Sequence, residues 1–174
     1  MKSYFLFLRR RLRKKFSNIK LIVTDVDGVL TNGEIGYSYG IHGFKLFNVK
    51  DGLAVKLLKS NGISLALISG GDSEATRARA QSLCINECHT NIENKLTTLK
   101  EIQYRLMISP ENTLYIGDDI NDLVVLPEVS LFVVPNDCHN KILRESDLKL
   151  RTKGGEGVLR EVCDIISNIN NFKY

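Results

Sequence analysis

The stretch Leu21-Ile22-Val23-Thr24-Asp25-Val26-Asp27-Gly28 is the part of the sequence that decides the fold. Three aliphatic residues are followed, after one threonine, by two acids that flank a single valine. Such an apolar run is typical of a parallel strand that is buried on both faces and that delivers polar groups at its carboxyl end. Unpaired acids are costly to desolvate at such a position, so we expect Asp25 and Asp27 to serve a function.

The order of strand, polar loop and helix recurs along the chain. We expect strands at 21–23, 63–68, 87–90, 113–116 and 129–134, and helices at 51–61, from the loop 69–73 to residue 83, at 94–107, after 122 and after 157. Repeated units of this kind predict an α/β fold with a doubly wound parallel sheet. Ligands of such sheets bind beyond the carboxyl ends of the strands, where the polar loops of this chain fall.

Residues 32–49 interrupt this order. Glycines at 33, 36, 40 and 43 separate short alternating stretches, which predicts a β-hairpin that projects from the core. Asp51 follows at a position that suits the N-cap of the next helix, and a capping role alone would explain it.

Charge divides the chain into two parts. Eight of its 24 basic residues and no acidic residue lie in residues 1–20, which leaves 16 basic against 20 acidic residues in the remainder. We therefore expect a basic N-terminal extension at residues 1–18 and one domain at residues 19–174. A solvated arm is favoured over contact with a membrane surface, and no nucleic-acid partner is expected. Because no proposed catalytic group lies there, removal of residues 1–17 is expected to leave activity nearly unchanged.

The four cysteines form neither a CxxC pair nor a dense framework, so neither a zinc ribbon nor a disulfide scaffold is indicated. The apolar stretch at residues 4–8 is too short to span a membrane and precedes the basic residues, the reverse of a signal peptide. These features favour a reducing, cytoplasmic setting.

Polar residues from several loops are expected to meet at the carboxyl edge of the sheet. They are Asp25 with Asp27, Ser69 with Gly70, and Asp118 with Asp119 and Asp122, and Lys95 at the start of a helix can join them. Crowded carboxylates repel one another unless a cation neutralises them. A hard divalent metal with oxygen ligands fits this grouping, and Mg²⁺ suits a site of few carboxylates completed by water and phosphate.

These residue types point to phosphomonoester hydrolysis. With a metal bound, the Asp25 carboxylate can attack phosphorus and form an aspartyl-phosphate. Asp27 is placed to protonate the leaving alcohol and then to activate water. Ser69 would hold phosphoryl oxygens, and Lys95 would offset charge in the transition state. Taken singly, Ser69 would also suit a turn and Asp122 a surface acid.

Four motifs resemble those of the haloacid dehalogenase superfamily and occur in the same order. They are Asp25-Val26-Asp27-Gly28-Val29-Leu30-Thr31, Ser69-Gly70, Lys95 and Gly117-Asp118-Asp119-Ile120-Asn121-Asp122. More narrowly, residues 47–52 and 154–162 resemble 3-deoxy-D-manno-octulosonate 8-phosphate phosphatases. This resemblance covers about residues 19–168, and it implies a capless fold and a place in lipopolysaccharide biosynthesis.

The resemblance also implies the roles of individual residues. Asp25 would be the nucleophile and Asp27 the acid/base. Magnesium would be held by the Asp25 carboxylate, the Asp27 backbone carbonyl and Asp118, with Asp119 and Asp122 supporting these ligands from behind. The expected substrate is a sugar-acid phosphate, 3-deoxy-D-manno-octulosonate 8-phosphate.

Substrate recognition is implied to involve Gly70, Asp51 and Arg79, the last of these serving an adjacent subunit of a homotetramer built through the hairpins. The chain departs from the family at Gly71-Asp72, where octulosonate enzymes usually have arginine and nonulosonate 9-phosphate phosphatases glutamate. A nonulosonate 9-phosphate phosphatase of the sialic-acid type is therefore kept as an alternative. A weakly catalytic domain for oligomerisation or tethering is the other, although the complete set of acidic motifs argues against it.

Overall fold

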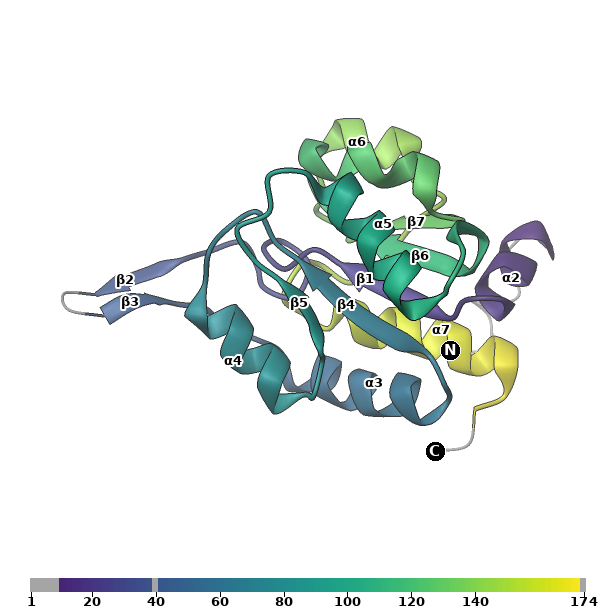
Figure 1. Cartoon of the computed structure of the whole chain (residues 1–174), viewed down its shortest axis with the longest axis horizontal. Coiled ribbons are helices and arrows are strands. Elements are labelled where there is room, and N and C mark those ends of the chain that lie inside the picture. Colours follow the sequence, from purple (N-terminus) through teal and green to yellow (C-terminus); the bar gives the residue numbers. More distant parts are fainter. Residues whose placement is uncertain (1–9, 39–40, 173–174) are drawn as a thin grey trace.

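The computed structural model describes residues 10–38 and 41–172, and its centre is a sheet of six parallel strands. The strand order is β5-β4-β1-β6-β7-β8 (Figure 1). The strands are β1 (Leu21–Thr24), β4 (Ser64–Ile68), β5 (Glu87–His89), β6 (Thr113–Ile116), β7 (Leu131–Val134) and β8 (Leu148–Lys149). After β1, the chain adds β4 and β5 on one side of this strand and then β6, β7 and β8 on the other side. This order confirms the predicted doubly wound α/β fold.

Strand β1 holds the sheet together because it pairs on both sides. Leu21 lies opposite Ser64 of β4 and opposite Thr113 of β6, and the register continues to Thr24. All four residues of β1 are buried. Their side chains alternate between the two faces of the sheet, which is how a continuous apolar run serves a sheet covered on both sides.

Helices cover both faces of this sheet (Figure 1). One face carries α3 (Val49–Ser60), α4 (Glu74–Ser82) and α7 (Val158–Asn170), which bury Leu58, Ala80 and Ile166 against it. The other carries α5 (Lys95–Leu106), the 3₁₀ segment η2 (Ile120–Glu128) and α6 (Asn140–Glu145). No helix in the described part of the chain is long and apolar enough to cross a membrane.

The hairpin predicted at residues 32–49 is present. Its strands β2 (Gly36–Ser38) and β3 (Ile41–Phe44) are antiparallel and form a separate two-stranded sheet that projects from the body of the molecule (Figure 1). The insertion between β1 and α3 is this hairpin alone, so the described residues there include no cap domain.

Local chemistry explains where the observed elements differ from the predicted ones. The N-cap of α3 lies three residues earlier than expected, because it is Asn48, which accepts a hydrogen bond from Lys50 N–H; the prediction that Asp51 is the cap is wrong. The helix expected after residue 122 is the 3₁₀ segment η2, which contains Pro127 and thus lacks one backbone donor. Helix α6 and the two-residue strand β8 are too short to show a periodicity, and the sequence did not predict them.

The N-terminal segment contributes to the core. Residues Arg10–Ser17 form helix α2, which packs against α7 and buries Phe16 completely. Lys15 adds an ion pair of 2.9 Å with Asp147. Residues 10–17 are therefore part of the folded body and not a solvated arm. The basic extension stays a prediction for residues 1–9, which lie outside the described residues.

We expect Phe16→Ala to lower the free energy of unfolding by about 3–5 kcal/mol, because it leaves a cavity between α2 and α7. The expectation that removal of residues 1–17 leaves activity nearly unchanged stays a prediction, but the buried Phe16 indicates that such a removal would lower stability. Urea denaturation measures the change. Lys14→Ala is the matched control, since Lys14 is exposed on the same helix and its loss should alter stability by less than about 0.5 kcal/mol. Equal stability of Phe16→Ala and the wild type would show that α2 is dispensable.

Candidate active site

The strand order places three of the predicted motifs side by side. Asp25 directly follows β1, Ser69 directly follows β4, and Asp118 follows β6 after Gly117. Because β4 and β6 flank β1 in parallel, these residues leave the sheet at its carboxyl edge as neighbours. The predicted convergence of the motifs at this edge is what the topology produces.

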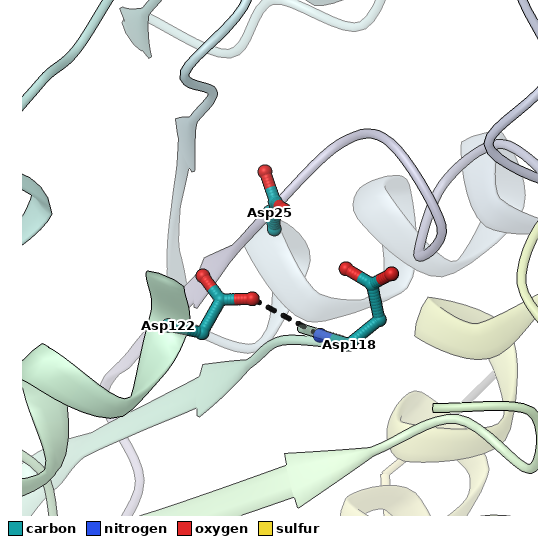
Figure 2. A group of neighbouring side chains, drawn as sticks. All are labelled: Asp25, Asp118 and Asp122. Carbon is teal, nitrogen blue, oxygen red and sulfur yellow. Dashed lines mark hydrogen bonds between the residues drawn. The ribbon is translucent and has the colours of Figure 1, made fainter. Parts of the chain in front are cut away.

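Three carboxylates form the centre of the site (Figure 2). Oxygens of Asp25, Asp118 and Asp122 lie within 4.8 Å of one another. Asp122 is fully buried, and its oxygens are already used: Oδ1 accepts from Tyr115 Oη at 2.8 Å, and Oδ2 accepts from the Asp118 N–H at 3.0 Å. Asp122 thus orients the other groups and is a buried acid, not a surface one.

Lys95 supplies the positive charge inside this cluster. It is the first residue of α5, whose N-cap Asn94 accepts from Thr97 N–H and so fixes where the helix begins. Its Nζ lies 3.1 Å from Asp25 Oδ2 and 2.7 Å from Asp122 Oδ1, and its side chain is only 3% exposed. Burial lowers the pKa of Lys95, but Asp25 and Asp122 outweigh this effect, so the net pKa is raised and the ammonium stays charged.

One ammonium does not balance the charge of three carboxylates, and the pKa values of two of the acids are raised. The pKa of Asp25 is raised to about 6. Burial is the largest cause, the negative charge of Asp122 acts in the same direction, and Lys95 opposes both. Burial also raises the pKa of Asp118 to about 8, with repulsion from Asp25 and Asp122 as the next causes. The cluster is therefore poised to lose protons when a further cation arrives.

The donor set fits a small divalent cation. Asp118 Oδ1 is buried and has no hydrogen-bond partner within the described residues. Gly28 passes so close to this side chain that a Cβ atom there would overlap the Asp118 carboxylate. Asp118 thus keeps an oxygen for a metal, while Asp122 is committed to Lys95 and to hydrogen bonds. Asp25 Oδ1 accepts from Val26 N–H at 2.7 Å and Oδ2 contacts Lys95, but a carboxylate oxygen has a second lone pair with which Asp25 can also bind a cation. Mg²⁺ binds in this manner, through one or two carboxylates completed by water and phosphate.

Asp27 and the loop after β4 border this cluster. Ser69 is buried, and its Oγ accepts a hydrogen bond from Gly71 N–H at 3.3 Å. A Cβ at Gly71 would lie 3.8 Å from both Asp27 Oδ2 and Ser69 Oγ, which places the loop 69–71 against Asp27. Gly70 is exposed on the same loop. Asp119 is also exposed and caps η2 by accepting from Ile120 N–H at 2.7 Å.

The structure does not bring Asp51 and Arg79 to the acidic cluster. Both line a small, mainly apolar pocket with Phe47, Leu83 and Leu159. Asp51 is buried, Asp51 Oδ1 accepts from Arg160 N–H at 2.9 Å, and burial raises the pKa of Asp51 to about 6. The Arg79 guanidinium donates to the Asn48 carbonyl at 3.0 Å. Their part in substrate binding stays a prediction.

Two residues of the site were missed by sequence reasoning. Tyr115, in the middle of β6, is fully buried, and burial and the Asp122 charge raise its pKa well above the ordinary value, so it remains a hydrogen-bond donor. Lys45, after β3, lies 2.7 Å from Asp27 Oδ1. The only available signals were an aromatic residue with a hydroxyl in a core strand and a lysine in an alternating hairpin, and neither is specific.

Comparisons with known proteins agree with this geometry. No protein-family model matches the chain. The chain is 36% identical over 152 residues to the 3-deoxy-D-manno-octulosonate 8-phosphate phosphatase KdsC of Escherichia coli K12, across 87% of this chain and 81% of the relative. A putative haloacid dehalogenase (HAD) superfamily hydrolase of subfamily III A from Legionella pneumophila has a TM-score of 0.90 at 29% identity, covering 98% of this chain and 92% of that one.

A second solved structure connects the fold to ligands. It is the 3-deoxy-D-manno-octulosonate 8-phosphate phosphatase of Moraxella catarrhalis, in complex with magnesium ion, phosphate ion and KDO. Its TM-score is 0.88 at 35% identity, with 91% of each chain covered. Together with the identity to the Escherichia coli enzyme and the buried acidic cluster, this likeness shows that the chain belongs to the 3-deoxy-D-manno-octulosonate 8-phosphate phosphatase family, a group of HAD-type phosphomonoester hydrolases.

Proposed function

We propose that this protein hydrolyses 3-deoxy-D-manno-octulosonate 8-phosphate in a magnesium-dependent reaction that passes through an aspartyl-phosphate. The observation that carries the proposal is the convergence of Asp118 with the buried Asp25 and Lys95 at the end of the central strand. The names of the relatives support the substrate, and the Moraxella catarrhalis complex supports the metal and the sugar acid.

Magnesium would be held by the carboxylates of Asp25 and Asp118 and by the backbone carbonyl of Asp27. When bound, it would neutralise charge on the cluster and on the phosphoryl oxygens. Asp122 holds the Asp118 backbone N–H and Lys95 in place, which keeps both ligands oriented. Asp119 is not one of the proposed ligands. It caps η2 and so fixes the segment that carries Asp122.

Asp25, Asp27 and Ser69 have separate roles in the proposed reaction. Asp25 attacks phosphorus: a bond forms between its carboxylate oxygen and phosphorus while the bond from phosphorus to the sugar oxygen breaks. Asp27 gives a proton to the departing sugar oxygen, and it later removes a proton from the water that cleaves the aspartyl-phosphate. Ser69 Oγ and the N–H groups of Gly70 and its neighbours would hold the non-reacting phosphoryl oxygens.

The departure at Gly71-Asp72 leaves the sugar acid acceptable. Asp72 would repel a sugar carboxylate if its charge were free, but it is paired with the Arg77 guanidinium. The pair is exposed, with Asp72 on the loop that follows Ser69 and Arg77 on α4. Because the pairing offsets the Asp72 charge, this departure from the family pattern does not exclude an anionic sugar.

The active site is also proposed to need a second copy of the chain. The hairpin and the start of α3 expose large apolar side chains, namely Ile35, Phe44, Leu46, Val49 and Leu53, of which Val49 is 81% exposed. Because no cap domain covers the site in the described residues, subunits that meet through these side chains would shield the substrate from water. A homotetramer with Arg79 facing a neighbouring site is the assembly we propose.

The substrate proposal is tested by a panel of sugar phosphates assayed with magnesium. We expect a higher kcat/KM for 3-deoxy-D-manno-octulosonate 8-phosphate than for a nonulosonate 9-phosphate. Asp25→Asn should reduce turnover of both by about 10³-fold or more, because the amide cannot attack phosphorus, while circular dichroism stays unchanged. Preference for the nonulosonate ester would move the proposal to that substrate, and an active Asp25→Asn protein would refute the nucleophile.

The metal proposal has a readout other than activity. The unfolded chain releases the protons of Asp25 and Asp118 near their ordinary pKa of 3.8, whereas the folded metal-free chain holds them to about 6 and about 8. The stabilisation from these two groups is thus complete below about pH 3.8, and it is lost as the pH rises from there to about 8. In EDTA, we expect a lower Tm at about pH 8.5 than at about pH 5.5, and a larger increase on adding Mg²⁺ at the higher pH.

Asp118→Asn is the matched control for this measurement. The amide has no proton to lose, so the fall of Tm with pH should become shallower and the response to Mg²⁺ should shrink. A Mg²⁺ response that is equal at both pH values, or that survives Asp118→Asn in full, would contradict the assigned ligands.

Assembly is tested with Phe44→Asp and Arg79→Ala by light scattering and kinetics. We expect Phe44→Asp to dissociate the oligomer and to lose activity, because it places a charge in the apolar contact. Arg79→Ala should raise KM for the sugar-acid phosphate more than for a phosphomonoester without a carboxylate. Arg144→Ala, an exposed arginine on α6, should change neither. A fully active monomeric wild type would end this part of the proposal.

A further inference from the structure

Lys45, at the base of the hairpin, reaches the proposed active site and is nearly buried. Lys45 follows β3, and its side chain is only 5% exposed. Its Nζ lies 2.7 Å from Asp27 Oδ1 and 2.8 Å from Asp27 Oδ2. Asp27 itself belongs to the loop after β1, so this contact joins the base of the projecting hairpin to the loop that carries the chemistry.

The contact restricts how the Asp27 carboxylate can turn. An ammonium that has left water needs a close anionic partner, and Lys45 obtains both oxygens of one carboxylate. A carboxylate held at both oxygens loses rotation about its terminal bond, which an exposed aspartate would keep. Since the Asp27 side chain is 31% exposed, a carboxylate in this position would otherwise sample several orientations.

The two oxygens of Asp27 do not face the same surroundings. Oδ1 is buried and lies 2.7 Å from Lys45 Nζ, but it has no hydrogen-bond partner among the described residues, because the Lys45 ammonium donates to Oδ2. Oδ2 lies on the side of the loop 69–71, because a Cβ built at Gly71 would be 3.8 Å from it and equally far from Ser69 Oγ. Oδ2 therefore faces the loop that would bind the phosphoryl group and also accepts the hydrogen bond from Lys45.

We propose that Lys45 is a positioning residue for acid and base catalysis by Asp27. It holds the carboxyl group through its contacts with both oxygens, so that Asp27 is oriented to give its proton to the sugar oxygen as the bond from phosphorus to that oxygen breaks. The same carboxylate then takes a proton from the water whose oxygen bonds to phosphorus. This inference rests on the proposed phosphatase function and adds a residue from the hairpin to it.

The leaving group distinguishes this role from others. A sugar alkoxide is a strong base and needs the proton of Asp27, whereas nitrophenolate is a weak base and leaves without one. Loss of a residue that acts through Asp27 should therefore slow phosphoryl transfer to Asp25 selectively for the sugar phosphate, whereas the later hydrolysis of the aspartyl-phosphate is common to both substrates. A residue that binds the phosphoryl group, or one that only maintains the fold, should affect both substrates equally.

The test compares Lys45→Met with the wild type on 3-deoxy-D-manno-octulosonate 8-phosphate and on p-nitrophenyl phosphate. We expect kcat/KM, which reports the steps up to departure of the leaving group, to fall by about 10²-fold for the sugar phosphate and by less than about 5-fold for p-nitrophenyl phosphate. Asp27→Asn should show the same selectivity. The double variant should be no slower on the sugar phosphate than Asp27→Asn alone, because Lys45 acts through Asp27.

Two further variants complete the design. Lys45→Arg can still reach the carboxylate and should recover part of the lost kcat/KM, which also guards against a folding defect in Lys45→Met. Lys56→Met removes an exposed lysine from α3 and should match the wild type on both substrates. Equal losses of kcat/KM on the two substrates, or additive losses in the double variant, would overturn the role of Lys45. An inactive wild type would instead refute the phosphatase proposal itself.

Discussion

Three carboxylates lie close together with one ammonium, and this imbalance of charge is the constraint on which the rest of the site depends. Lys95 is almost fully buried and contacts both Asp25 and Asp122, yet it leaves the group net negative. Without a further cation the pKa of Asp118 is raised to about 8, so this acid holds its proton at neutral pH, and the pKa of Asp25 is raised to about 6. The fold thus prepares a site that is electrostatically incomplete, which is a state suited to binding a metal and a phosphate ester together.

The backbone around this cluster has no room for larger residues. A side chain at Gly28 would overlap Asp118, and one at Gly117 would overlap Asp122. The glycine segment near the C-terminus closes the loop after β1 from the other side: Gly155 N–H donates to the Val29 carbonyl at 3.0 Å, and Gly154 approaches the Gly28 carbonyl. Small residues at these points allow the backbone and the carboxylates to approach closely. The glycines of the motifs are therefore needed for packing, as the acids are for the proposed chemistry.

The sequence predicted the sheet and the acidic cluster because both follow from local rules. Apolar runs that end in acids mark the strands of a covered parallel sheet, and parallel strands end at one edge. It did not predict α6 and β8, which are too short for periodicity, or the 3₁₀ form of η2. It also missed the contact of Lys45 with Asp27 and the burial of Phe16, because both depend on how distant segments meet. Asp51 was misassigned as a cap since Asn48 competes for the same helix end.

The position of β1 in the sheet has a consequence for how the protein is made. Asp25 leaves the ribosome before both neighbours of β1 in the sheet, because β4 and β6 begin at residues 64 and 113. Asp122, which orients the cluster, follows β6, and α7, against which α2 packs, begins only at residue 158. During synthesis the acidic loop must therefore remain without its partners until β6 and Asp122 have emerged. A nascent chain paused before β6 would carry the phosphatase motif but would have no site in which to use it.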